Sequence, residues 1–348
     1  MNIAFFTDSY LPNKDGVVVS ISLLKEELEN QGHKVYVFAP SPDGKERESK
    51  DVFYFTSTPF KPYPDYKFAF PNFLKLKDVF KEKNIDIVHN HGVALTAWAA
   101  LAMANAFNLP SISTFHTSIA DATHYIAKNR LIEKSAEKLA WAYLKFLYSK
   151  FNVVTAPTTY ASNKLKAHGI NAIVMPNGIK TDAFKGKRKP EKDSLLHVGR
   201  VVKEKGFDVV FPYLTDIHLY VAGKGPGIDY FKSKAKELNV SHLVHFLGFV
   251  SDEELKRLYK TKTALVFTSR FDTQGLVILE ALASGMPVMA LKGTVGEELA
   301  SSVFWDKQSF VRAFEEVKRV DEKECVKKAK EYDIKRIAKR WINLFNQL

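Results

Sequence analysis

Two carboxylates eight positions apart mark the segment from Ser269 to Val288, which reads SRFDTQGLVILEALASGMPV. Asp272 comes directly before a Thr-Gln-Gly turn, and Glu280 lies in the apolar stretch that follows. A glycine turn at a helix start exposes backbone N–H groups and the positive end of the helix dipole, which suits a diphosphate. Carboxylates suit sugar and ribose hydroxyls, because their oxygens accept hydrogen bonds. The alternative is an acid that favours the helix dipole, followed by a surface glutamate.

A second group of residues supplies positive charge. Gly199 and Arg200 follow an apolar run, and Lys205 comes five residues after Arg200. A departing diphosphate requires fixed cations, and arginine offers a planar fork where lysine offers a point charge. The glycine-rich turn from Gly223 to Gly227 is not a P-loop, because no Ser or Thr follows its Gly-Lys pair. Each feature alone is typical of solvated surface, so the weight rests on their occurring together.

Short apolar runs separated by amphipathic segments must position these residues. Such runs occur at 3–6, 35–38, 85–88, 111–114 and 153–156, and again at 195–198, 219–222, 244–246, 264–267 and 288–290. They lack strict alternation, which indicates parallel strands covered on both faces by helices, such as those expected at 17–31 and from 333 onward. The pattern starts again after a Met-Pro-Asn-Gly turn at 175–178. We therefore predict two doubly wound α/β domains, residues 1–176 plus 333–348, and residues 177–332.

Composition narrows the class of protein. The chain has 348 residues, of which 46% are hydrophobic and 26% charged, as in globular proteins of about two domains. A net charge of +12 implies an anionic partner, namely nucleic acid, an acidic membrane surface or a phosphorylated ligand. The single cysteine, Cys325, excludes an internal disulfide and favours a cytoplasmic setting. The longest nearly apolar run, 93–107, is too short to span a bilayer.

In their order along the chain, these motifs resemble glycosyltransferase family 4. The resemblance rests on the acid pair and on the small-x-Gly-x-Pro-Val turn at Ala283 to Val288. The family usually has Glu at the first acid, where this chain has Asp272, whose shorter side chain changes its reach. The resemblance implies a GT-B fold, with two Rossmann-like doubly wound domains facing a central cleft. It also implies transfer of a hexose from a nucleotide diphosphate with retention of configuration.

Particular roles follow from the same resemblance. Arg200 and Lys205 would stabilise the leaving diphosphate, Asp272 would hold the sugar, and His116 would orient the reactants; these four are the expected catalytic residues. The expected donor-binding residues are Gly16, Gly199, Arg200, Lys205, Gly223, Phe249, Val250, Asp272, Thr273, Gln274, Gly275, Leu276 and Glu280, with Glu280 on the ribose. The expected acceptor-binding residues are Tyr10, His116, Thr117, Asp121 and Tyr125.

No metal or other cofactor is expected. The chain contains no Asp-x-Asp pair, so the cations of Arg200 and Lys205 would take the place of a metal at the diphosphate. His89-Asn90-His91 has the look of a metal site, but no third ligand follows at a suitable spacing.

Three features favour a lipid acceptor. The sequence Asp272-Thr273-Gln274-Gly275 and the loop 63–71 resemble diacylglycerol glucosyltransferases. In addition, Lys134, Lys138, Trp141 and Lys145 share one stripe of a predicted helix, which suits an anionic interface, or else is a solvated basic face with one packed tryptophan. We therefore expect UDP-glucose as donor, a membrane lipid such as diacylglycerol as acceptor, and a peripheral location at the inner face of the membrane.

Other functions stay open at this point. A soluble sugar or a polysaccharide precursor could be the acceptor, and the shortened loop at 289–298 leaves the donor sugar open. An epimerase or a phosphorylase shares the fold, although the lysine context of a pyridoxal-dependent phosphorylase is missing. A non-catalytic sugar-nucleotide sensor is a further alternative. A nucleic-acid binding protein is disfavoured, because the basic residues are dispersed over both halves without a recognisable module.

Overall fold

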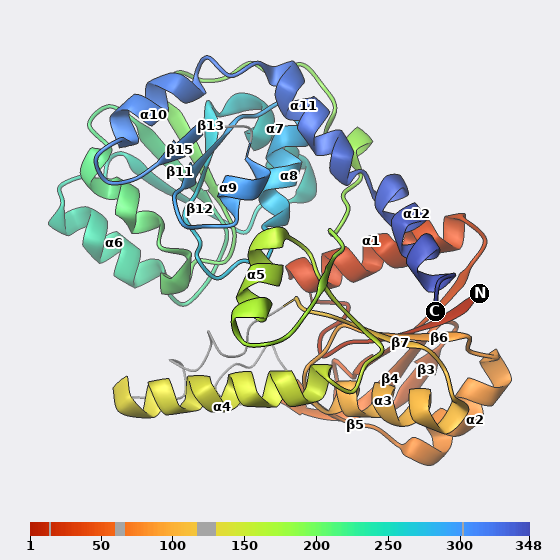
Figure 1. Ribbon diagram of the computed structural model, residues 1–348. Coiled ribbons are helices and arrows are strands. Elements are labelled where there is room, and N and C mark those ends of the chain that lie inside the picture. The colour runs from red at the N-terminus through yellow and green to blue at the C-terminus, as the bar shows by residue number, and fades with distance from the viewer. Residues whose placement is uncertain (14, 60–66, 117–129, 301–302) are drawn as a thin grey trace. The chain divides into compact units, whose positions relative to one another are not determined.

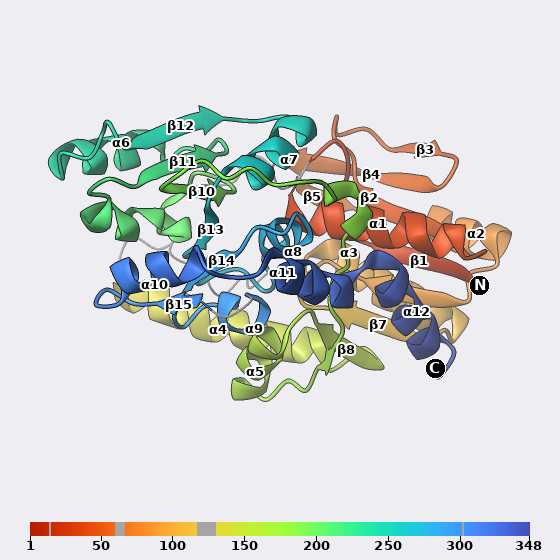
Figure 2. The same cartoon turned by 90° about the horizontal axis from the view of Figure 1, so that it is seen from above.

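The computed structural model describes residues 1–13, 15–59, 67–116, 130–300 and 303–348. The chain forms two compact units (Figures 1 and 2). Unit 1 consists of Met1–Gly178 and Ile334–Leu348, and unit 2 consists of Ile179–Asp333. The breaks predicted from the sequence come after residues 176 and 332.

Unit 1 is built on a mainly parallel sheet with the strand order β3-β4-β2-β1-β6-β7-β8-β9, and with β5 paired to β4. The β3–β4 and β4–β5 pairs are antiparallel, and the others are parallel. The strands are β1 (Asn2–Phe6), β2 (Lys34–Pro40), β3 (Arg47–Ser49), β4 (Val52–Pro59), β5 (Lys67–Phe70), β6 (Ile87–Asn90), β7 (Ser111–Thr114), β8 (Val153–Ala156) and β9 (Ile173–Val174).

Helices cover both faces of this sheet. Their bounds are α1 (Gly16–Asn30), α2 (Phe73–Lys83), α3 (Leu95–Phe107), α4 (Arg130–Tyr148), α5 (Thr159–Ala167) and α12 (Ile334–Phe345). On one face, α1 and the returning α12 pack on residues such as Phe5 and Val37. On the other face, α2 and α3 pack on their neighbours Phe6 and Phe38. Successive strand residues thus enter opposite cores, which is why the strands lack polar alternation.

Unit 2 has a parallel sheet in the order β12-β11-β10-β13-β14-β15. The strands are β10 (Ser194–Val198), β11 (His218–Ala222), β12 (Val244–Gly248), β13 (Ala264–Phe267), β14 (Val288–Leu291) and β15 (Val303–Trp305). The α-helices are α6 (Ile228–Glu237), α7 (Asp252–Thr261), α8 (Leu276–Ala283), α9 (Gly296–Leu299), α10 (Phe310–Val317) and α11 (Glu322–Ala329). Short 3₁₀ helices lie at η2 (Thr181–Phe184), η3 (Lys203–Lys205), η4 (Phe207–Tyr213) and η5 (Lys330–Tyr332).

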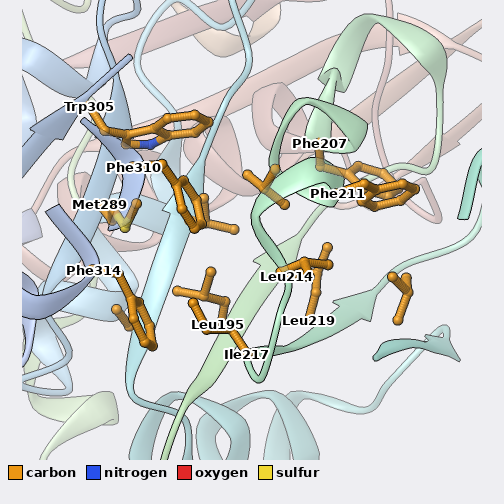
Figure 3. Close-up of a cluster of buried hydrophobic side chains, with 14 of the residues drawn as sticks. Leu195, Phe207, Phe211, Leu214, Ile217, Leu219, Met289, Trp305, Phe310 and Phe314 are labelled. Atoms are coloured by element: carbon orange, nitrogen blue, oxygen red, sulfur yellow. The ribbon is translucent and has the colours of Figure 1, made fainter. Parts of the chain in front are cut away.

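An aromatic core anchors the sheet of unit 2 (Figure 3). Leu195 of β10 and Leu219 of β11 lie in the same cluster as Phe207 and Phe211 of η4, and Phe310 joins them from α10. Each of these side chains is fully buried, and such burial contributes about 1.5–3 kcal/mol per side chain. This packing holds the segment from β10 to η4, which carries Gly199, Arg200 and Lys205.

The expected strands and the doubly wound α/β class are confirmed. β6 begins at Ile87 and so lies two residues later than the apolar run at 85–88 suggests. The sequence did not reveal β3, β4, β5, β9 or β15. In the part of the chain that the structure describes, no helix combines the length and apolar character needed to cross a membrane.

Candidate functional site

The expected donor-binding residues of unit 2 gather at the carboxyl ends of adjacent parallel strands. Gly199 follows β10, Gly223 follows β11 and Phe249 follows β12, and these three strands are neighbours in the sheet. Backbone hydrogen bonds join the strand ends, from Gly199 N to Ala222 O at 3.0 Å and from Gly223 N to Gly248 O at 2.8 Å. Open α/β sheets bind ligands at this edge, so the fold brings the predicted residues to a suitable place.

At Gly223 two of these loops come too close for any other residue. Its φ is +156°, and a Cβ atom built there would lie 1.8 Å from the carbonyl oxygen of Gly199. No side chain fits such a contact, whereas glycine tolerates both the dihedral and the approach. The glycine thus keeps the β10 and β11 loops in contact beside Arg200, whose side chain is exposed.

Lys205 and Asp272 form an ion pair. The Lys205 Nζ atom lies 2.7 Å from Asp272 Oδ1 and 2.8 Å from Oδ2. The Thr268 hydroxyl, at the end of β13, donates to the Lys205 carbonyl at 2.6 Å and so ties the two segments together. Burial raises the pKa of Asp272, but the Lys205 ammonium lowers it by more, so that the pKa lies below its ordinary value. The carboxylate is therefore ionised near neutral pH, and a cation and an anion lie at one strand edge.

Glu280, the second acid, is held by a tyrosine that the sequence did not single out. The Tyr259 hydroxyl, on α7, donates to Glu280 Oε2 at 2.7 Å. Burial raises the pKa of Glu280, and the hydroxyl bond, which lowers it, offsets this only in part. The ring of Tyr259 is fully buried, so this donor has a fixed position. One oxygen of Glu280 is thus oriented from the protein side.

The turn between the two acids begins α8. Gly275 is the residue before the helix and has φ +74°, and a Cβ atom there would approach Phe267 to 2.9 Å. Gln274 is buried, whereas Thr273 and Leu276 are half-buried. A helix start of this kind presents backbone N–H groups and the positive dipole end, the arrangement expected for binding a phosphate.

The loop after β12 differs in its exposure. The Phe249 side chain is 61% exposed, and the Lys224 Nζ lies 5.9 Å from the centre of its ring. Val250, the next residue, is half-buried. An exposed aromatic ring at a strand end offers a stacking surface for a nucleotide base.

His197 is a further residue that the sequence did not single out. It lies on β10 two residues before Gly199, is buried, and packs on Phe207 with ring centroids 4.5 Å apart. Burial, reinforced by the charge of Lys205, lowers the pKa of His197 to about 3. A neutral imidazole therefore lies close to the Lys205–Asp272 pair. Its position on a buried strand gave no sign of this proximity before the sheet order was known.

In unit 1, His116 has a histidine partner. His116 follows β7, His91 follows the adjacent strand β6, and His91 Nδ1 lies 2.9 Å from His116 Nε2. Burial lowers the pKa of His116 to about 4, and burial also lowers that of His91 well below its ordinary value. Because both rings are neutral near pH 7, one nitrogen of the pair donates and the other accepts. His91 therefore fixes the tautomer and orientation of His116.

His89 belongs to the core. Its ring packs against Trp341 of α12, and its Nε2 lies 2.7 Å from the Thr114 hydroxyl. In the described ranges, no group of three or more His, Cys, Asp or Glu side chains could hold a metal ion.

Other expected residues of unit 1 are placed unequally. Gly16 is exposed at the start of α1, and a Cβ atom there would meet nothing within 4 Å. Asp15 caps this helix by accepting from the backbone of Val17 and Val18, at 2.9 Å each. Tyr10 is only 7% exposed and packs in the core on the α1 side, so its ring offers little surface to an acceptor. Thr117, Asp121 and Tyr125 lie outside the described residues, as does most of the loop at 63–71.

The interpretation of Trp141 as part of an exposed basic stripe is wrong. Trp141 is 5% exposed, and its ring stacks on His168 with centroids 3.7 Å apart. The tryptophan thus belongs to the inner face of α4, while Lys134, Lys138 and Lys145 are exposed. The alternative of a basic face with one packed tryptophan describes these four residues.

Two Rossmann-like units, one with charged groups at its strand ends, define the class of α/β protein that handles nucleotide ligands. The family models agree with this class. Residues 14–183 match the model described as Glycosyltransferase Family 4, and residues 178–302 match the model described as Glycosyl transferases group 1.

Curated relatives include two alpha-monoglucosyldiacylglycerol synthases. The protein from Streptococcus pneumoniae is 30% identical over 344 residues, covering 90% of this chain and 77% of the relative. The protein from Acholeplasma laidlawii is 30% identical over 325 residues, covering 83% and 80%. The chain therefore belongs to glycosyltransferase family 4, and it is a glycosyltransferase, which transfers a sugar to an acceptor.

Solved structures show the same fold. Sucrose-phosphate synthase from Thermosynechococcus elongatus superposes with a TM-score of 0.76 at 16% identity, over 99% of this chain and 98% of that one. Anabaena HepE, solved in complex with UDP-glucose, superposes with a TM-score of 0.75 at 15% identity, over 100% of both chains. The expected GT-B fold is confirmed.

Proposed function

We propose that this glycosyltransferase moves glucose from UDP-glucose to diacylglycerol or a closely related membrane lipid, with retention of configuration. The observation that carries the proposal is the strand edge of unit 2, where Lys205, Asp272 and Glu280 meet the start of α8. The two relatives at 30% identity bear names that specify an α-linked monoglucosyl diacylglycerol product. Because UDP-glucose is itself α-linked, an α-linked product corresponds to retention.

The charges of unit 2 have complementary roles in this proposal. Arg200, Lys205 and the N–H groups at the start of α8 would stabilise the negative charge that develops on the departing UDP. The Lys205 ammonium has three N–H donors, two of which Asp272 accepts, so one remains for a phosphate oxygen. Asp272 would accept from a sugar hydroxyl, and Glu280 from the ribose. Since these cations supply the positive charge, we propose that no metal is required.

Unit 1 contributes a neutral imidazole. His116, oriented by His91, would hydrogen-bond the sugar or the acceptor hydroxyl without carrying charge itself. No role in acceptor binding is retained for Tyr10, because its ring is packed in the core. Gly16, open on the surface, would allow a close approach of the donor to the start of α1.

A product analysis tests this function. Purified protein is incubated with diacylglycerol vesicles and separately with UDP-glucose, UDP-galactose and GDP-mannose, since GDP-mannose-dependent alpha-mannosyltransferases are 26% identical to this chain. We expect a glucolipid from UDP-glucose, with an α-anomeric proton signal in the NMR spectrum. EDTA should leave the rate within about twofold of its value without chelator. A β-linked product, a different donor, or transfer to soluble sugars alone would contradict the proposal.

A further inference from the structure

Helix α4 exposes a row of large apolar side chains. Ile132 is 59% exposed, Leu139 is 71% exposed and Phe146 is 54% exposed. They are spaced seven residues apart, close to two turns at about 3.6 residues per turn, so all three lie along one side of the helix. We call these three residues the α4 row.

The opposite side of the helix packs on the body of unit 1. Trp141, Leu144, Leu147 and Tyr148 are all nearly or fully buried there. The fold therefore needs this inner face but not the α4 row. Large hydrophobic side chains left in water over two thirds of a helix mark a surface that another apolar phase covers.

Lysines flank the α4 row. Lys134, Lys138, Lys145 and Lys150 are exposed, and the Lys150 Nζ lies 4.8 Å from the centre of the Phe146 ring. Among the described exposed side chains from residue 132 to residue 150, Glu137 is the only acid. The partner must therefore combine an apolar layer with negative charge. A second copy of this chain would bring the same lysines into contact with each other, which disfavours self-association.

We propose that the α4 row and its flanking lysines dock on the surface of an anionic lipid bilayer. The three apolar side chains would enter the boundary between headgroups and acyl chains, and the lysines would lie among the lipid phosphates. The helix lies in the plane of the interface rather than across it, since its inner face stays in the protein. This surface rests on the proposed function for its purpose, because it brings a lipid acceptor to unit 1.

The test is vesicle flotation of the whole chain, without donor or acceptor. One set of vesicles is phosphatidylcholine alone, and in the other about one lipid in three is phosphatidylglycerol. The row variant carries Leu139→Ser and Phe146→Ser, and the matched control carries Val311→Ser, which removes a side chain 63% exposed on α10 of unit 2. Because all three positions are exposed, the variants should fold, as thermal melting by circular dichroism would verify.

We expect the wild type and the control to float with the anionic vesicles and only weakly with phosphatidylcholine. The row variant should lose roughly tenfold or more in vesicle partitioning. A variant with Lys138→Glu and Lys145→Glu should lose the preference for anionic vesicles. Wild-type protein that does not float, a row variant that floats as well as the wild type, or a control that fails equally would overturn the proposal.

Two further outcomes separate this proposal from its neighbours. A wild-type dimer in solution that the row variant converts to a monomer, without vesicle binding, would overturn bilayer docking in favour of self-association. Because flotation requires no turnover, a failure to glucosylate diacylglycerol would leave a positive flotation result standing. In that case the membrane surface holds, and the acceptor in the proposed function is wrong.

Discussion

The Tyr259 hydroxyl holds one oxygen of Glu280 at 2.7 Å, which makes Tyr259 a positioning residue for the expected ribose ligand. Tyr259→Phe keeps the buried ring and the carboxylate but removes this restraint. We expect the KM for UDP-glucose to rise roughly three- to tenfold while kcat stays within about twofold, because ribose binding is the same in ground and transition states. Steady-state release of UDP measures both constants.

A matched variant separates this effect from general loss of packing. Tyr213→Phe alters a tyrosine of the same unit whose ring stacks on Phe310, with centroids 5.0 Å apart. It should keep both constants. An unchanged KM in Tyr259→Phe, or an equal fall in both variants, would show that the Tyr259 hydroxyl does not position Glu280.

A second prediction at this scale concerns His116. An ordinary histidine has a pKa of about 6.5, whereas burial lowers that of His116 to about 4. The ring thus takes up a proton only as the pH falls through about 4. We expect the pH profile of kcat/KM to show no limb near pH 6.5 that depends on His116. If such a limb exists in the wild type and His116→Asn removes it, the imidazole is charged in the working enzyme and its proposed role fails.

Individual residues were predictable from the sequence, but their partners were not. Lys205 and Asp272 each belong to a recognisable motif, yet 67 positions separate them, and only the adjacency of β10 and β13 brings them together. Tyr259 lies in α7 outside any motif, which is why it was missed. His91 was weighed only as a metal ligand. Its bond to His116 depends on the pairing of β6 with β7, which no local pattern reveals.

At the scale of elements, the contact between the β10 and β11 loops is the feature most sensitive to a small change. Gly223→Ala would place a Cβ atom 1.8 Å from the Gly199 oxygen, so both loops must move. Gly32→Ala is the matched control, with a similar positive φ of +86° but nothing within 4 Å. We expect Gly32→Ala to cost about 1 kcal/mol in stability and to keep activity. Gly223→Ala should cost several times more, roughly 3 kcal/mol, and abolish donor binding.

Urea unfolding and titration with UDP-glucose check this pair of variants. Equal losses of stability in the two would mean that the clash at Gly223 relaxes without disturbing the strand ends. Donor binding retained by a folded Gly223→Ala variant would mean that the contact between the loops is not needed for the site.

Elements buried on both sides were the easiest to predict. β10, β11 and β13 are nearly continuous apolar runs, because each face packs against a helical layer or the aromatic core. The missed strands lie at sheet edges or are very short. β3 is fully exposed and polar, and β4 alternates buried and exposed residues, so neither resembles a central parallel strand.

For the whole molecule, buried neutral histidines link stability to pH. Unit 1 holds His89, His91 and His116, and unit 2 holds His197; burial lowers the pKa of all four. In the unfolded chain each has a pKa of about 6.5, so below that pH the unfolded state binds more protons than the folded state. The free energy of unfolding must then fall as the pH drops from about 6.5 toward 4, by a few kcal/mol in total.

Urea unfolding near pH 7.5 and near pH 5 measures this dependence, with two transitions expected because the chain has two units. Both midpoints should be lower at the acidic pH, and that of unit 1 should fall further, since it holds three of the four histidines. Equal stability at the two pH values would mean that these rings are protonated in the folded chain.

The central claim is that this family 4 glycosyltransferase uses UDP-glucose and a lipid, with Glu280 holding the donor. The most direct measurement is release of UDP from UDP-glucose, with and without vesicles of diacylglycerol and anionic lipid, for the wild type and for Glu280→Ala. We predict release that requires the vesicles and falls roughly a hundredfold or more in the variant. Release that is indifferent to vesicles, or undiminished in Glu280→Ala, would contradict the account.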